Sequence, residues 1–231
     1  MIDLRNINQL YGSSQILWDL SLKLSSGSCT CLMGRNGVGK TTLLKCLMGL
    51  LAIESGEIII DGRNVTKEKT ELRPKLGVGY VPQGRDIFPE LTVEENLKVA
   101  LAGRSDKSKR IPTFIFDLFP VLASMMTRRG GDLSGGQQQQ LAIGRALVIE
   151  PQLLILDEPN EGIQPNIVNQ IGDVVTLLNR ERGTTVLLVE QKLAFARRVG
   201  NDFYLMEKGE IVASGEMDQL SDNLIQKHLA V

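Results

Sequence analysis

The sequence has only one histidine and three cysteines among its 231 residues, and its acidic and basic residues nearly cancel. The spacing of Cys29, Cys31 and Cys46 fits neither a zinc site nor a redox pair, so we expect buried apolar cysteines in a reducing cytosol. A net charge of −1 argues against nucleic acid as a partner. There is no run of about 18 apolar residues and no signal-peptide pattern at the N-terminus. We therefore expect no membrane-spanning segment, so that any role at a membrane would depend on a partner.

What is present is the composition of an ordinary globular protein, with 42% hydrophobic and 23% charged residues. The length suits a single α/β domain over residues 1–231. Strand patterns disappear between residues 84 and 149, which predicts a helical insert between core segments 1–83 and 150–231. The predicted strands are residues 2–7, 15–24, 28–33, 56–62, 76–83, 153–156 and 184–189, with a hairpin over 202–213. The predicted helices are residues 42–51, 92–101, 114–126, 134–148, 167–178 and a short one from 217 onward.

Residues 34–41 read G-x-x-x-x-G-K-T, the spacing of a phosphate-binding loop between a strand and a helix. The loop's backbone N–H groups would point at the β- and γ-phosphates, and the helix N-terminus would add its positive dipole end. Lys40 would reach the terminal phosphates, and the Thr41 hydroxyl would ligate Mg²⁺. A glycine-rich turn that only links strand to helix is the alternative. The nucleotide-binding residues predicted here are Gly34, Arg35, Asn36, Gly37, Val38, Gly39, Lys40, Thr41 and Thr42.

Two carboxylates, Asp157 and Glu158, end the predicted strand 153–156. Open α/β sheets bind their ligands at strand ends. In a phosphate-loop enzyme Asp157 can hold Mg²⁺ through water, and Glu158 is then placed to polarise the attacking water. The alternative is a pair of acidic residues at a solvent-exposed strand end.

A second anion-binding pattern begins the helix that runs to residue 148. Ser134 is a capping residue, and Gly135 and Gly136 leave bare N–H groups at the helix N-terminus before Gln137. One chain needs only one phosphate cradle for one nucleotide, so the second cradle predicts a nucleotide held by another chain. A plain capped helix start is the alternative.

The phosphate loop, residues 133–137 and the Asp157-Glu158 strand, in this order, resemble an ATP-binding cassette of the transporter type. The resemblance covers nearly the whole chain. It implies a phosphate-loop NTPase fold with a mixed sheet core, an N-terminal antiparallel β part and a helical subdomain that carries the signature motif. ATP and Mg²⁺ are the implied ligands, with Tyr11 stacking on adenine and Gln83 sensing Mg²⁺ and the membrane partner. Without the family, Tyr11 could equally be a turn aromatic and Gln83 a polar residue at a strand end.

The chain departs from the cassette pattern at a few positions. Gln191 stands where the switch histidine is expected, and His228 lies too far along the chain to replace it. Gln164 stands at an aspartate position, and Asn160 stands where Thr or Ser is usual, for which the sequence offers no physical account. A glutamine can hydrogen-bond a γ-phosphate but cannot accept a proton as imidazole can. Hydrolysis here would then be slower or depend wholly on Glu158. The predicted catalytic residues are Lys40, Glu158 and Gln191.

The same departures resemble one of the two non-identical ATPases of branched-chain amino acid uptake systems. Within that group, residues 35–49 and 161–165 look most like the urea-uptake branch. The implied function is ATP hydrolysis that energises uptake of urea or short-chain amides, and the alternative is uptake of branched-chain or hydrophobic amino acids. A soluble cassette acting on ribosomes or DNA and a metabolite kinase are further alternatives. The sequence has neither a second cassette nor heptads, and residues 133–137 argue against a kinase.

The resemblance also implies partners. A second, non-identical ATPase chain would face this one head to tail, with a homodimer as the form in isolation. Integral membrane permease subunits would hold the chain at the cytoplasmic face of the cell membrane, and a periplasmic or extracellular solute-binding protein would act indirectly. We expect the helical insert to dock the permease beside Gln83, because it is rich in apolar residues. The alternative is that these residues form the insert's own core. They are Phe114, Ile115, Phe116, Leu118 and Phe119.

Overall fold

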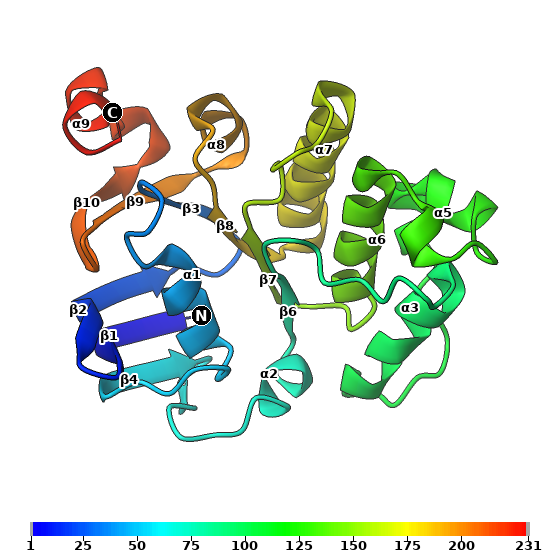
Figure 1. The fold of residues 1–231 in the computed structure, drawn as a ribbon, viewed down its shortest axis with the longest axis horizontal. Helices are drawn as coiled ribbons and strands as arrows, with labels where there is room; N and C mark the ends of the chain where they lie inside the picture. The colour runs from blue at the N-terminus through cyan, green and yellow to red at the C-terminus, as the bar shows by residue number, and fades with distance from the viewer. Residues whose placement is uncertain (1, 230–231) are drawn as a thin grey trace.

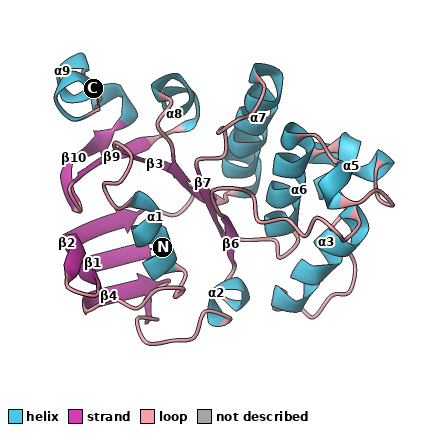
Figure 2. Ribbon diagram, viewed as in Figure 1, coloured by secondary structure: helices cyan, strands magenta, loops and turns pink. Residues whose placement is uncertain are grey.

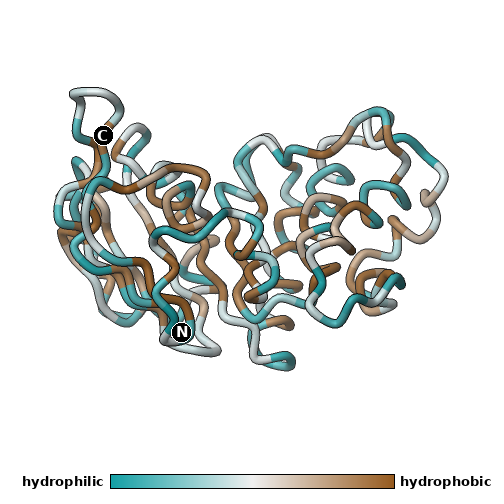
Figure 3. Tube along the Cα trace, turned by 90° about the horizontal axis from the view of Figure 1, so that it is seen from below, coloured by the Kyte–Doolittle hydropathy of each residue, from teal (hydrophilic) through white to brown (hydrophobic). Residues whose placement is uncertain are grey.

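The computed structural model describes residues 2–229 of the chain. The strands occupy one end and the centre of the molecule, and α3, α5 and α6 lie together at the other end (Figures 1 and 2). In Figure 3 the brown, apolar stretches run through the strands and the helices that cover them. Within residues 2–229, no helix is long and apolar enough to cross a membrane.

An antiparallel sheet of four strands forms the N-terminal part, in the order β2-β1-β4-β5. β1 and β2 pair from Ile2 opposite Leu24 to Tyr11 opposite Ser14. The alternating pattern of residues 20–24 predicted a half-buried strand, and Leu20, Leu22 and Leu24 are indeed buried. The antiparallel β part is therefore confirmed. The strands are β1 (Ile2–Tyr11), β2 (Ser14–Leu24), β4 (Ser55–Ile60) and the unpredicted β5 (Arg63–Asn64).

A mixed sheet of six strands forms the centre, in the order β10-β9-β3-β8-β7-β6. Only the β9–β10 pair is antiparallel, and it is the predicted hairpin, turning at Lys208 and Gly209. Because the other pairs are parallel, β3, β6, β7 and β8 all end at one edge of the sheet. The strands are β3 (Cys29–Met33), β6 (Val78–Val81), β7 (Leu153–Asp157), β8 (Thr185–Val189), β9 (Asp202–Glu207) and β10 (Glu210–Glu216).

The two faces of the mixed sheet belong to two different apolar cores. Along β7, Leu153 and Ile155 belong to the core formed with α1 (Lys40–Leu47) and the antiparallel sheet. Leu154 and Leu156 belong to the core formed with α6 (Gly135–Leu147), α7 (Pro165–Arg182) and α8 (Leu193–Val199). A strand buried on both faces reads as a continuous apolar run, as residues 153–156 do. The three cysteines are buried, as predicted.

The helical insert has shorter helices than the sequence predicted. The helix predicted over 114–126 is divided into α4 (Phe114–Leu118) and α5 (Pro120–Ser124), because Phe119 precedes a proline and adopts ψ 73°. The helix predicted over 92–101 is α3 (Val93–Val99), with the predicted capping box between Thr92 and Glu95, followed by a 3-10 turn, η1 (Ala100–Gly103). A second 3-10 turn, η2 (Gly130–Asp132), precedes α6.

The apolar residues expected to dock the permease lie in the insert's own core. Ile115 and Phe119 are fully buried, and Phe114, Phe116 and Leu118 are partly buried against the same core. The burial of Ile115 and Phe119 favours the alternative for these two residues, and docking of a permease by the insert stays a prediction. Exposed apolar side chains of the insert lie elsewhere, at Phe88 and Val99.

Some helices differ from the prediction in their limits or were not predicted at all. α1 begins at Lys40 and ends at Leu47, so it starts and stops earlier than the predicted 42–51, and Gly49 follows it at φ 70°. α2 (Leu72–Lys75) and α8 were not predicted. The C-terminal segment forms η3 (Met217–Gln219) and α9 (Asp222–His228), and the last residues of the predicted terminal helix lie outside the described residues.

Candidate functional site

The phosphate loop connects β3 to α1, and its glycines are needed for its shape. Gly37 and Gly39 adopt φ values of 79° and 109°, which side-chain-bearing residues rarely adopt. A Cβ atom on Gly34 would collide with the backbone carbonyl of Met206 in β9. α1 has no side-chain cap at its N-terminus, so its first N–H groups stay available to an anion.

The side chain of Lys40 folds back across the loop. Its ammonium donates to the carbonyl oxygens of Gly34 (2.8 Å) and Arg35 (2.9 Å), and it lies 3.7 Å from Oε1 of Glu158. Burial lowers the pKa of Lys40, and the nearby carboxylates oppose that shift. The lysine is 5% exposed, so a cation is held directly beneath the loop.

Thr41 and Asp157 face one another across the end of the sheet. The Thr41 hydroxyl donates to Oδ2 of Asp157 at 3.0 Å, while Oδ1 of Asp157 is buried without a protein partner. Burial raises the pKa of Asp157 to about 6, and the Thr41 hydrogen bond opposes that shift. A buried carboxylate oxygen without a partner is a position where a cation or its bound water would be accepted.

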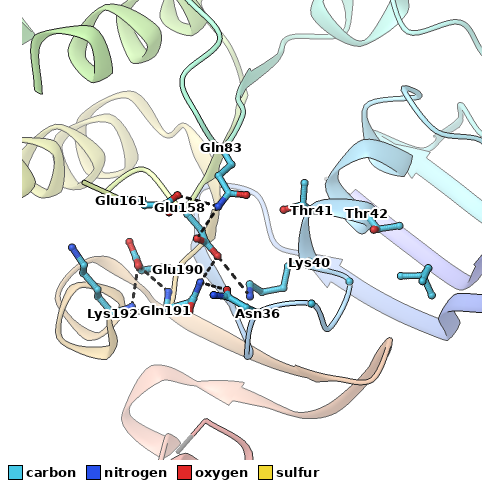
Figure 4. A pocket seen from close by; sticks show the side chains of 13 residues that line it. Asn36, Lys40, Thr41, Thr42, Gln83, Glu158, Glu161, Glu190, Gln191 and Lys192 are labelled. Atoms are coloured by element: carbon cyan, nitrogen blue, oxygen red, sulfur yellow. Dashed lines mark hydrogen bonds and ion pairs between the residues drawn. The ribbon is translucent and has the colours of Figure 1, made fainter. Parts of the chain in front are cut away.

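The Glu158 carboxylate contacts side chains from three other segments, namely Lys40, Gln83 and Gln191 (Figure 4). Its backbone adopts φ 49°, and its N–H donates to Val189 at 2.9 Å, which turns the side chain into the cavity. Oε1 accepts from Nε2 of Gln191 at 2.6 Å, and Oε2 accepts from Nε2 of Gln83 at 3.3 Å. Gln191 also donates to Oδ1 of Asn36 at 2.6 Å. The predicted catalytic residues thus lie together, although no single strand carries them all.

Gln83 is held by two carboxylates. Its Nε2 atom donates to Glu161 at 3.0 Å as well as to Glu158. In Figure 4 the amide oxygen of Gln83 points toward Thr41. This orientation leaves an oxygen ligand beside the Thr41–Asp157 pair.

Of the residues described above, Lys40, Thr41, Gln83, Glu158 and Gln191 line a cleft of about 690 Å³. Sequence reasoning missed four of its lining residues, Ile16, Glu161, Glu190 and Lys192. Ile16 comes from β2 and lies far from any motif, so no sequence pattern marked it as a residue of the site. Glu161 and Glu190 adjoin recognised motifs and could have been singled out for that reason. Tyr11 lies at the end of β1, 47% exposed and outside the residues that line the cleft, so its stacking on adenine stays a prediction.

The second predicted cradle lies in a different cavity. Ser134 caps α6, and its hydroxyl and the side chain of Gln137 form a reciprocal capping box. Ser134, Gly135, Gly136 and Gln137 line a cavity of about 500 Å³ that also includes Gln164. None of these residues lines the cleft of the phosphate loop. Within one chain, the two anion-binding helix starts therefore do not share a ligand.

His228 lies outside the cleft, as predicted. Its Nδ1 atom lies 2.9 Å from a carboxylate oxygen of Glu207, at the junction of α9 and β9. It is not among the cleft-lining residues, so Gln191 has no histidine substitute within the described chain.

Comparison with known proteins gives consistent results. A family model described as ABC transporter matches residues 17–161. A probable branched-chain amino acid transport ATP-binding protein of Archaeoglobus fulgidus is 36% identical over 219 residues, covering 94% of this chain and 92% of the relative. A high-affinity branched-chain amino acid transport ATP-binding protein of Pseudomonas aeruginosa is 38% identical over 214 residues, covering 92% and 91%.

Solved structures agree with the sequence comparison. A dimeric ATP-binding cassette in a post-hydrolysis state, bound to ADP and phosphate, matches with a TM-score of 0.84 at 25% identity. The match covers 94% of this chain and 99% of that one. The predicted fold class is confirmed.

Proposed function

The chain belongs to the ABC transporter family and is an ABC-type ATPase, and from this premise we propose that it energises an importer of amino acids. The convergence of Lys40, Thr41 and Glu158 on one cleft, with Asp157 hydrogen-bonded to Thr41, is the observation that supports ATP hydrolysis as its task. The relatives named above, which are amino acid transport ATP-binding proteins, support the cargo class.

The nucleotide would enter at the phosphate loop. The uncapped N–H groups at the start of α1 would bind the β- and γ-phosphates, and the Lys40 ammonium would exchange the loop carbonyls for phosphate oxygens. Because Lys40 already lies beneath the loop, this exchange needs only a short movement of its side chain.

The residues present fit a magnesium ion. The donors are oxygens, as Mg²⁺ prefers, namely the Thr41 hydroxyl, the unpartnered Oδ1 of Asp157 and the Gln83 amide. Among residues 2–229 there is no cluster of three or more His, Cys, Asp or Glu side chains, so the site suits an ion that keeps water and phosphate ligands. When bound, the ion would neutralise charge on the β- and γ-phosphates. Thr41 and Asp157 would hold it, with Gln83 completing the set.

Glu158 would polarise the attacking water. Gln191 and Gln83 both donate to its carboxylate, which fixes its orientation. Gln191 can donate to a γ-phosphate oxygen but has no proton-accepting nitrogen. Proton removal in this site would therefore fall on Glu158 alone.

The second cavity supports a head-to-tail pair of chains. Ser134, Gly135 and Gly136 would contact the γ-phosphate held by the opposing chain, and that chain's own motif would close the cleft described here. We propose that the physiological partner is a related, non-identical ATPase that carries the switch histidine. This chain's own cleft would then be the slower of the two sites.

A groove between β6 and the helical insert is our proposed permease-docking surface. It has a volume of about 390 Å³ and is lined by Tyr80, Phe88, Val99 and Arg145 among others. Phe88 and Val99 are 44% and 47% exposed, and the Arg145 guanidinium lies 5.2 Å from the centre of the Phe88 ring. Exposed apolar surface of this kind is typical of a protein interface. Docking here would hold the chain at the cytoplasmic face of the membrane.

Urea or a short-chain amide is the second candidate cargo. It rests on residues 35–49 and 161–165, which look most like the urea-uptake branch. The two candidates differ in the solute-binding protein rather than in this chain, since the ATPase does not touch the cargo.

The test is to purify the tagged chain with its native membrane complex and to identify the associated solute-binding protein. A rise in that protein's melting temperature with leucine or another amino acid supports the amino acid importer, and a rise with urea alone supports the second candidate. If ATP hydrolysis by the reconstituted complex does not respond to the loaded binding protein, the chain does not energise import.

A further inference from the structure

Asn160 and Glu190 form a buried pair that joins two loops of the site. Asn160 follows β7 and Glu190 follows β8, and the Asn160 amide nitrogen donates to Oε2 of Glu190 at 2.6 Å. Asn160 is fully buried and Glu190 is 3% exposed. A buried carboxylate is costly unless its oxygens are hydrogen-bonded, so the pair is a strong constraint on both loops.

The other oxygen of Glu190 shapes the turn that carries Gln191. Oε1 accepts the backbone N–H groups of Gln191 (2.8 Å) and Lys192 (2.9 Å), as Figure 4 shows. The Lys192 ammonium in turn donates to the Asn160 carbonyl at 3.0 Å. The turn after β8 is therefore tied to the loop after β7 in two places.

The turn places the Gln191 amide between two groups of the nucleotide cleft. Its Nε2 atom lies 2.6 Å from both Oε1 of Glu158 and Oδ1 of Asn36. A chain of hydrogen bonds thus leads from Asn160 through Glu190 and Gln191 to Glu158. An error of about 1 Å in such a position can reduce a rate about 100-fold.

We propose that Asn160 and Glu190 are positioning residues for ATP hydrolysis, which act by holding Gln191 against Glu158. The inference rests on the proposed roles of Glu158 and Gln191. It gives a physical reason for an asparagine at position 160: its amide reaches Glu190 and donates to it inside the protein.

The test uses an exchange that preserves the hydrogen bonds. Asn160→Asp alone sets two carboxylates against one another and should lower single-turnover ATP cleavage by the purified full chain about 10- to 100-fold. Adding Glu190→Gln restores a donor opposite position 160, while the remaining oxygen still accepts both backbone N–H groups. The double variant should return to within about threefold of the original rate. Asn179→Ala is the control, since this amide bonds only Gly27 and Thr184, away from the cleft.

A second measurement separates positioning from simple structural support. Asn160→Ala should lower kcat about 10-fold in the unaltered chain but less than about twofold when Gln191→Ala is already present, because both act through one amide. ATP affinity should change little, and the melting temperature should fall by the same amount in both backgrounds, because Asn160→Ala leaves one buried oxygen of Glu190 without its donor. Equal losses in both backgrounds, or an unrepaired double variant, would overturn the inference. If Glu158→Gln is inactive while Asn160→Asp is fully active, only this inference fails; if Glu158→Gln stays active, the proposed role of Glu158 fails.

Discussion

The chain contains two helix N-termini suited to an anion, and they differ in what surrounds them. The start of α1 has no side-chain cap and lies beside Lys40, Asp157 and Glu158. The start of α6 is capped by Ser134 and Gln137, and the Arg85 guanidinium lies beside Gly135, but none of the described residues that line its cavity is a carboxylate or a lysine. Only the first can move a proton or hold a metal ion. The second can bind a phosphate oxygen but cannot catalyse its transfer.

This contrast explains why one chain would not form a complete site. The cleft with the carboxylates and Lys40 lacks a second set of N–H donors, and the cavity with those donors is lined by no carboxylate and no lysine among the described residues. Two chains facing head to tail would bring one of each together twice. We expect substitutions in the cleft of the phosphate loop to affect catalysis in this chain, and substitutions at the start of α6 to affect nucleotide binding by the opposing chain.

Glu158→Gln is expected to have the largest effect. The amide keeps the shape of the carboxylate and one of its two acceptor oxygens, but it cannot accept a proton from water, so turnover should fall by about 10²–10⁴-fold. ATP binding should persist. Phosphate release and nucleotide affinity are the measurements, with Asp173→Asn on the surface of α7 as the control. Near-normal turnover would show that Glu158 does not polarise the attacking water.

Lys40→Ala should weaken ATP binding about 100-fold or more, since it removes the only buried cation beneath the phosphate loop among the described residues. Equilibrium titration with a fluorescent ATP analogue measures the loss. Lys45→Ala, in the same helix but outside the cleft, provides the matched control. Unchanged affinity would contradict the assignment of phosphate binding to this loop.

Ser134→Arg should damage a site that this chain does not itself contain. In the reconstituted transporter, the bulky side chain should block the partner's nucleotide and lower turnover about 10-fold or more. ATP binding to the isolated chain should stay unchanged, because Ser134 does not line its own cleft.

Removing the partner's switch histidine should lower turnover more than Gln191→Ala in this chain. If a homodimer of this chain hydrolyses ATP as fast as the full complex, the asymmetric arrangement is wrong.

The smallest effect is expected from Asp157→Asn in the nucleotide-free chain, where the quantity measured is the free energy of unfolding. Asp157 has a pKa raised to about 6 by burial, so the folded state takes up a proton before the unfolded state does as pH falls. Without nucleotide, stability should therefore rise as pH falls from about 6 toward 4. At pH 7 the variant should be more stable than the original by about 1–3 kcal/mol, and this advantage should shrink toward pH 4. Urea denaturation at several pH values measures it, and a pH-independent difference would contradict this explanation.

The motifs that could be recognised in the sequence are those whose chemistry is local. A phosphate loop needs its glycines, lysine and threonine within eight consecutive positions, 34–41, because one backbone turn makes the cradle. The capped start of α6 and the carboxylates after β7 are local for the same reason. Apolar runs and alternation likewise predicted the strands, since burial on one or two faces is decided by neighbouring residues.

The tertiary structure decided which of these loops meet. Gln83, Glu158 and Gln191 converge because β6, β7 and β8 lie side by side and end at one edge of the sheet, an order that no local pattern encodes. The same applies to Ile16, which reaches the cleft from another sheet, and to the buried bond between Asn160 and Glu190, 30 positions apart. The sequence by itself determined the chemistry of each loop. Only folding determined the contacts between loops, because they depend on packing between residues distant in the chain.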